Sequence, residues 1–147
     1  MKSAKTFFSE IEQQKIIQSI QDAEKETTAE IRVHIENICF GNPLKRAEKI
    51  FLQQNMHVTK ERNGVLFYMA VWNRKLAIIG DKGIYEKVPP KEWDTLVRQL
   101  ITSFKNNENK CETLCQCIKT IGQWLTTYFP ITHHDNPNEL SDEISFS

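Results

Sequence analysis

Hydrophobic and polar residues follow two different periods along this chain, and the periods predict the order of its elements. Ser9 and Glu12 form a capping-box pattern just before apolar residues at helical spacing, so we expect a first helix from about Glu10 to Glu24. Residues 31–35 then alternate between apolar and polar side chains. This alternation is typical of a strand with two unequal faces.

The middle of the chain predicts a crossover helix followed by a buried hairpin. Residues 41–43, Gly-Asn-Pro, supply a turn, an N-cap and a proline at the first helical position. From Val65 to Trp72 nearly every residue is apolar, which indicates a central strand covered on both faces. Residues 73–74 allow a short turn, so we expect Leu76 to Ile79 to return antiparallel.

The last third of the chain predicts two amphipathic helices and a polar tail. Apolar residues from Trp93 to Phe104 recur at helical spacing, and a second helix should run from about Cys111 to Tyr128. Pro130 stops that helix. Apolar residues are sparse in 132–147, so we expect a flexible C-terminal tail after a single domain of residues 1–131.

The predicted order is helix, strand, helix, strand, strand, helix, helix. The first crossover should join two neighbouring parallel strands through a right-handed connection. The hairpin should add an antiparallel strand. Burial of both faces of the central strand requires helices on both sides of the sheet. We therefore expect an α/β fold, a three-layer α/β/α sandwich with a mixed parallel and antiparallel sheet.

Composition and charge narrow the classes of partner. The chain has 147 residues, enough for one domain with a proper core, and 19 lysines and arginines balance 19 aspartates and glutamates. Because the chain has no net positive charge to attract a polyanion, binding to nucleic acid is disfavoured. No segment approaches the roughly 20 apolar residues of a membrane span, and the first ten residues lack a signal-peptide core. We expect a cytoplasmic monomer without membrane insertion.

The four cysteines are better read as small buried hydrophobes than as ligands or nucleophiles. Cys111 and Cys115 share a helical face, Cys117 points elsewhere, and Cys39 is remote in sequence. There is no Cys-x-x-Cys pair for a zinc or thioredoxin-like centre. Free cysteine is commonly buried, and unpaired thiols fit a reducing compartment.

The strongest candidate for chemistry is the turn Gly-Asp-Lys-Gly at residues 80–83. Its glycines let the backbone curl and expose carbonyl oxygens beside the carboxylate of Asp81. Calcium requires several such oxygen ligands. The same four residues are also an ordinary turn in which aspartate bonds to nearby amides, and both interpretations stay open.

The stretch from Arg62 to Val88, which holds the hairpin and this acidic turn, resembles the TPM domain family, in a short soluble bacterial form. The resemblance covers approximately residues 7–129 and implies an α/β/α sandwich that binds divalent ions at loops near the end of the sheet. It implies Ca²⁺ or Mg²⁺ as the cofactor and Asp81 as a ligand.

Three further residues complete the candidate metal site. Glu30 enters the first strand at a segment similar to the family's Thr-x-Glu/Gln-Ile start, with Glu26 just before it. Asn63 precedes the central strand and could offer a side-chain carbonyl. Each has a plain alternative, since acidic residues at a strand start are commonly solvated and Asn63 next to a glycine can simply make a turn.

Three functions are therefore considered, and binding of divalent cations ranks first. A weak metal-dependent phosphatase acting on phosphate esters is the second, because the family carries a phosphatase label. Cys-x5-Arg, Asp-x-Asp and Walker motifs are absent, so no catalytic residue is assigned. A protein-interaction module with an unknown partner, using an exposed helical face around Trp93 or Trp124, is the third.

Overall fold

The computed structural model describes residues 2–131 and 144–147. Its elements are a short 3-10 helix η1 (Ala4–Thr6), α1 (Glu10–Glu24), β1 (Ile31–Glu36), α2 (Pro43–Gln53), β2 (Val65–Ala70), β3 (Lys75–Gly80), α3 (Lys82–Tyr85), α4 (Pro90–Lys105), α5 (Lys110–Tyr128) and β4 (Ser145–Phe146). This order confirms the predicted succession of helices and strands and adds three short elements, η1, α3 and β4.

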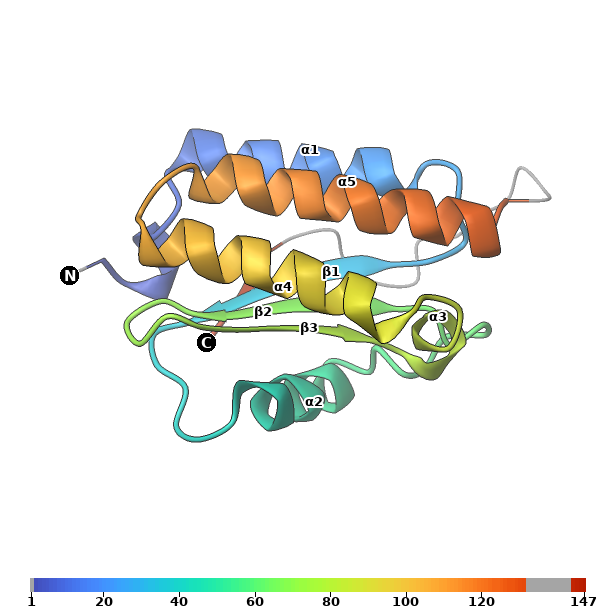
Figure 1. Ribbon diagram of the computed structural model, residues 1–147, viewed down its shortest axis with the longest axis horizontal. Coiled ribbons are helices and arrows are strands. Elements are labelled where there is room, and N and C mark those ends of the chain that lie inside the picture. Colours follow the sequence, from blue (N-terminus) through green and yellow to red (C-terminus); the bar gives the residue numbers. More distant parts are fainter. Residues whose placement is uncertain (1, 132–143) are drawn as a thin grey trace.

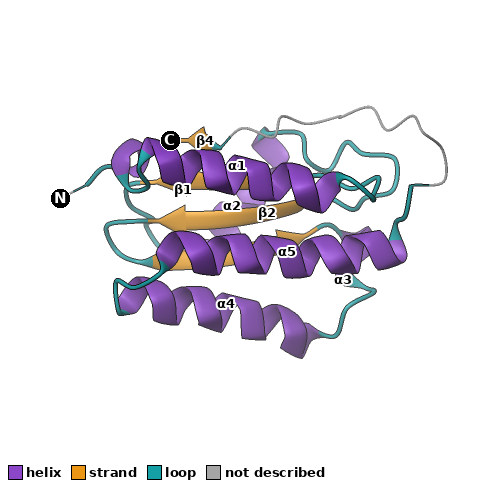
Figure 2. Ribbon diagram, turned by 90° about the horizontal axis from the view of Figure 1, so that it is seen from above, coloured by secondary structure: helices purple, strands orange, loops and turns teal. Residues whose placement is uncertain are grey.

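The strands form one mixed sheet in the order β3-β2-β1-β4. β1 lies parallel to both β2 and β4, whereas β2 and β3 form the antiparallel hairpin. Helices α1, α4 and α5 cover one face and α2 covers the other (Figures 1 and 2). The predicted three-layer α/β/α arrangement is confirmed.

β2 shows why the middle strand needs helices on both sides. All six of its residues are buried. Val65, Phe67 and Met69 belong to the large core under α1, α4 and α5. The intervening residues of β2 belong to the smaller core over α2. Because successive side chains of a strand point to opposite faces, a continuous apolar run fills both cores.

The predicted helix caps are present. The Ser9 side chain accepts a hydrogen bond from the amide of Glu12, and the Glu12 carboxylate accepts one from the amide of Ser9, at 3.1 and 3.0 Å. The Asn42 side chain caps α2 by accepting from the amides of Leu44 and Lys45. These bonds satisfy amides that have no partner within the helix, which explains where both helices begin.

The structure differs from the sequence prediction at three places. β2 ends at Ala70, and residues 71–74 form the turn. The acidic turn continues into the one-turn helix α3. Residues 145–146 at the end of the chain form β4, which pairs with β1, and Ile144 before them is buried. The rest of the predicted flexible tail, 132–143, lies outside the described residues.

No helix in the described parts of the chain is both long and apolar enough to cross a membrane.

Candidate functional site

The predicted acidic turn lies at the amino ends of β1 and β2, where β3 ends and α3 begins. Asp81 is the N-cap of α3, and its carboxylate accepts a hydrogen bond from the amide of Lys82 at 2.8 Å. The Asp81 amide donates to the carbonyl of Gly64, which ties the turn to the start of β2. Asp81 is only 7% exposed. Its carboxylate is therefore rigidly placed between two loops.

Arg62 holds this carboxylate with two parallel hydrogen bonds. Its Nε donates to Oδ2 of Asp81 at 2.7 Å and its Nη2 donates to Oδ1 at 3.0 Å. These bonds raise the pKa of Arg62. The Arg62 side chain remains 39% exposed, in contrast to its partner. The pair is a bidentate guanidinium–carboxylate contact of the strong kind, with one end open to solvent.

Glycine is required where α3 meets the loop before β2. The Gly83 amide donates to the carbonyl of Arg62 at 2.8 Å. A Cβ atom at Gly83 would lie 2.3 Å from the carbonyl oxygen of Glu61 and 2.5 Å from that of Arg62. Glycine at position 83 therefore admits two backbone carbonyls of the neighbouring loop, which differ from the carbonyls of the turn itself that the glycine pattern was expected to expose.

Asn63 joins this turn to the segment that leads into β1. Its Nδ2 donates to Oγ1 of Thr28 at 3.2 Å, and the Thr28 hydroxyl donates to the carboxylate of Glu61 at 3.1 Å. We call Thr28, Glu61, Arg62, Asn63 and Asp81 the sheet-end site. Thr28 and Glu61 were not singled out from the sequence, because only the fold brings their two loops together.

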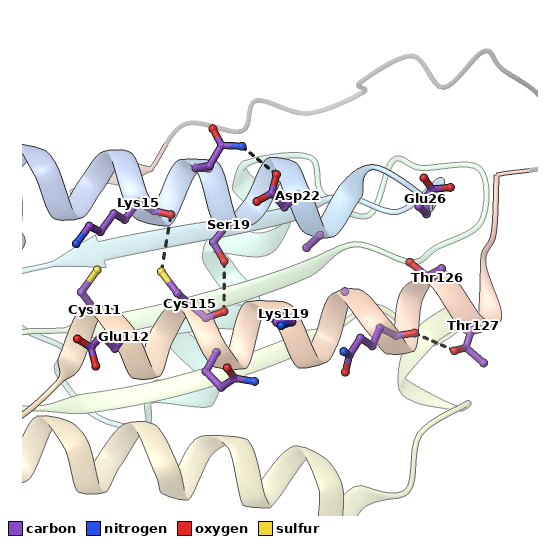
Figure 3. Close-up of a pocket in the computed structure, with 15 residues that line it drawn as sticks. Lys15, Ser19, Asp22, Glu26, Cys111, Glu112, Cys115, Lys119, Thr126 and Thr127 are labelled. Atoms are coloured by element: carbon purple, nitrogen blue, oxygen red, sulfur yellow. Dashed lines mark hydrogen bonds between the residues drawn. The ribbon is translucent and has the colours of Figure 1, made fainter.

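The two glutamates proposed from the resemblance lie at different places. Glu30 is 2% exposed at the start of β1, where its carbonyl accepts from the amide of Val65. The expectation of a solvated side chain is therefore wrong for Glu30. Glu26 is exposed and borders the groove between α1 and α5 (Figure 3). The structure thus places Asp81 and Asn63 at the same end of the sheet, whereas Glu26 lies beside the groove between α1 and α5.

A bound cation requires rearrangement of the sheet-end site. Among the described residues, no group of three or more His, Cys, Asp or Glu side chains is placed to hold a metal ion. Both Asp81 oxygens already accept bonds from Arg62. Calcium takes six to eight oxygen ligands, many of them neutral. The donor set fits such an ion only if the guanidinium leaves and neutral oxygens contribute.

The groove between α1 and α5 is a second hollow, with a volume of about 930 Å³ (Figure 3). Cys111 and Cys115 lie on its α5 wall, and their thiols donate to the carbonyls of Glu12 and Lys15. Burial raises the pKa of Cys111 to about 12 and also raises the pKa of Cys115. Such thiols are poor nucleophiles at neutral pH, which agrees with the reading of these cysteines as packing residues.

A buried polar network on the α2 side of the sheet was missed by the sequence analysis. The carboxylate of Glu36 accepts two hydrogen bonds of 2.9 Å from Arg46, one from the Tyr68 hydroxyl and one from Ser147. His34 bonds to Ser147 through Nε2 at 2.7 Å. The alternating strand pattern predicts a surface position for His34, yet it is only 4% exposed.

The electrostatics of this network follow from burial and from charge pairing. Burial lowers the pKa of His34 to about 4, against an opposing effect of Glu36. Burial raises the pKa of Glu36, but hydrogen bonds from Arg46, Tyr68 and Ser147 outweigh it and bring the value down to about 2. The network therefore holds a neutral imidazole beside an ionised carboxylate.

Trp93 and Trp124 do not form the exposed surface that the interaction hypothesis requires. Trp93 is 5% exposed and belongs to the large core. The Trp124 ring meets it edge to face, with ring centroids 5.1 Å apart. These rings serve packing between α4 and α5, and the sequence-based surface is corrected accordingly.

The fold and the hairpin with its acidic turn define an α/β sandwich of a recognisable class. The family model described as the TPM domain matches residues 2–122. The chain belongs to the TPM domain family, so the predicted resemblance is confirmed.

Solved structures agree with this assignment. The chain is similar over 100% of both chains to the BA42 protein of the psychrophilic bacterium Bizionia argentinensis, at 36% sequence identity and a TM-score of 0.87. N-terminal domains of cg2496 from Corynebacterium glutamicum and of a protein from P. gingivalis share the fold at 14% and 18% identity, with TM-scores of 0.63 and 0.67. Each alignment covers 88% of this chain and 83% of the other. No curated protein matches the chain.

Proposed function

We propose that this TPM domain binds a divalent cation, Ca²⁺ or Mg²⁺, at the sheet-end site. The observation that supports the proposal is the contact between Arg62 and Asp81. The Asp81 side chain is 6% exposed and its carboxylate holds a positive charge, while the Arg62 side chain that supplies the charge is 39% exposed. The position is thus already organised for a cation, and its present occupant can turn toward solvent.

Exchange of the guanidinium for a metal ion requires neighbouring oxygens. The Asp81 and Glu61 carboxylates would be the anionic ligands, and the side-chain oxygens of Asn63 and Thr28 on the adjoining loops would be the neutral ones. Glu30 lies buried at the start of β1, at this same end of the sheet. Loop ligands of mixed charge favour Ca²⁺ over Mg²⁺, because Mg²⁺ demands stricter octahedral geometry.

The test is an amide NMR titration with Ca²⁺ and Mg²⁺ of the wild-type protein and three variants. We expect saturable shifts at residues 61–64 and 80–84, with a Kd on the order of 10⁻⁴ to 10⁻³ M for Ca²⁺. Arg62→Gln removes the competing charge and should tighten binding about tenfold, which corresponds to about 1.4 kcal/mol. Asp81→Asn should abolish binding while α3 still forms, because asparagine is as good an N-cap as aspartate.

Asp94→Asn is the matched control, since Asp94 is an exposed aspartate on α4. It should bind as the wild type does. Binding that survives Asp81→Asn, or that weakens in Arg62→Gln, would show that the Arg62–Asp81 pair is purely structural. A phosphate-ester assay on the same samples tests the phosphatase alternative, which predicts turnover that is lost in Asp81→Asn.

A further inference from the structure

Another pocket lies at the end of the molecule opposite to the sheet-end site, beyond the carboxyl ends of the parallel strands β1 and β2. It has a volume of about 400 Å³. The N-terminal segment, the β2–β3 turn and the connection between α4 and α5 meet at this end (Figure 1). In open α/β sheets, ligands commonly bind outside the carboxyl ends of the strands. We call this cavity the hairpin pocket.

Positive charge dominates the hairpin pocket. Lys2, Arg74 and Lys110 all line it, each from a different segment of the chain. No aspartate or glutamate is among the described residues that line it. Within the described parts of the chain, none of the three cations forms an ion pair with a carboxylate. In a chain with no net charge, this is a local excess that attracts an anion.

Two of the three cationic groups are held in position by their surroundings. Nζ of Lys110 donates to Oδ1 of Asn107 and lies 5.5 Å from the ring centroid of Phe7. Arg74 has a left-handed backbone, with φ of 51°, in the β2–β3 turn, and its Nη1 lies 3.5 Å from the carbonyl oxygen of Lys105. An anion would meet charges that are already oriented, which lowers the entropic cost of binding.

Aromatic side chains form the rest of the wall. Phe7 stacks on Phe104 with ring centroids 5.3 Å apart. Trp72 is 44% exposed, and its indole Nε1 donates to the carbonyl of Lys2 at 2.8 Å, which holds the ring at the pocket. A cavity of this volume, with apolar walls and a few polar groups, has the make-up of a small-molecule site.

We propose that the hairpin pocket binds a small organic anion, a carboxylate or phosphate group carried on an aromatic ring. Arg74 and Lys110 hold the anionic group, with Lys2 adding to the field. The ring of the ligand packs against Trp72 and Phe7. The hairpin pocket differs from the sheet-end site in position and in charge, so either proposal can be correct without the other.

Amide NMR and tryptophan fluorescence can test this proposal with four probes: phenyl phosphate, benzoate, inorganic phosphate and benzyl alcohol. We expect phenyl phosphate and benzoate to shift the Trp72 indole signal and the amides of residues 107–110 in a saturable way. Inorganic phosphate and benzyl alcohol, which each carry half of the recognised chemistry, should bind at least tenfold more weakly. Comparison of phenyl phosphate with benzoate shows which anionic group the pocket prefers.

Substitutions in the hairpin pocket test whether the anion binds there. Arg74→Gln and Lys110→Gln should each weaken phenyl phosphate binding about tenfold, whereas Lys45→Gln, an exposed lysine on α2, should leave it unchanged. Equal affinities for phenyl phosphate and inorganic phosphate would overturn the aromatic part of the proposal. Shifts spread over surface lysines, or binding that is unchanged by both pocket substitutions, would overturn the site itself.

Discussion

Gly83 is the residue at which the acidic turn depends most directly on the absence of a side chain. Its amide reaches the carbonyl of Arg62, and a Cβ atom would be pressed against two backbone carbonyl oxygens. Backbone atoms on both sides leave little freedom to relax. Gly41 contrasts with it, since a Cβ there meets nothing within 4 Å but the backbone has a φ of 86°.

Substitution of these two glycines by alanine separates steric clash from backbone strain. We expect Gly83→Ala to lower the free energy of unfolding by about 3 kcal/mol, as overpacking in a confined place does. Gly41→Ala should cost only about 1 kcal/mol, the penalty of a left-handed conformation. Urea denaturation followed by circular dichroism measures both. Equal losses, or a larger loss for Gly41→Ala, would contradict the crowding that the structure shows at Gly83.

The packing of α1 against α5 likewise depends on a small residue. A Cβ atom at Gly122 of α5 would lie 2.6 Å from Cβ of Ala23 on α1 and 3.0 Å from its Cα. The two helices lie side by side on the outer layer (Figures 1 and 2). Glycine disfavours helices, but at this position only glycine permits such a close approach.

A pair of variants tests that helix contact. Gly122→Ala should lower the free energy of unfolding by about 2 kcal/mol through overpacking, despite its better helix propensity. Adding Ala23→Gly should recover part of this loss, because it removes the methyl group that clashes. Thermal and urea unfolding of both single variants and the double variant provide the double-mutant cycle. A coupling energy near zero would mean that the helices separate enough to admit a methyl group.

Across the whole molecule, the His34–Glu36 network ties the chain terminus to β1 and α2, and it makes stability depend on pH. The His34 pKa is about 4 in the folded state, against 6.5 for the free side chain. As pH falls, the unfolded state takes up the proton first. The contribution of His34 to the free energy of unfolding is therefore fully present above pH 6.5. It falls by on the order of 3 kcal/mol between pH 6.5 and 4.

Glu36 acts in the same direction at lower pH. Its pKa is about 2 in the folded state against 4.5 for the free side chain, so its contribution is lost between pH 4.5 and 2. Urea unfolding measured from pH 8 to 3 should show this decline. His34→Gln should remove the part of the slope between pH 6.5 and 4. An unchanged slope in that variant would assign the acid sensitivity to other groups.

Much of the fold could be predicted because its signals are local. The capping box at Ser9, the proline at the start of α2 and the apolar run of β2 each act within a few residues, and each gave the right element. The short elements α3 and β4 were missed. α3 has only four residues and β4 two, which is too short for a periodic pattern to show.

The candidate site was predictable only in part. The glycines around Asp81 indicate a turn with a carboxylate, and in the structure this carboxylate is buried and caps α3. The partner of that carboxylate is Arg62, 19 residues earlier, and sequence patterns do not specify such a pairing. The sequence suggests a cation ligand, whereas the structure shows a carboxylate that already holds a guanidinium.

By itself, the sequence determined the order of the main elements and the two buried faces of β2, because hydrophobic periodicity and turn chemistry are properties of neighbouring residues. The family was indicated separately, by the resemblance of residues 62–88 to the TPM domain. Only the tertiary structure decided which charged groups meet. His34 is buried because Ser145, 111 residues further on, lies against it, and the three cations of the hairpin pocket come from three distant segments. Such contacts arise when the sheet and its helices assemble, and they decide where a ligand can bind.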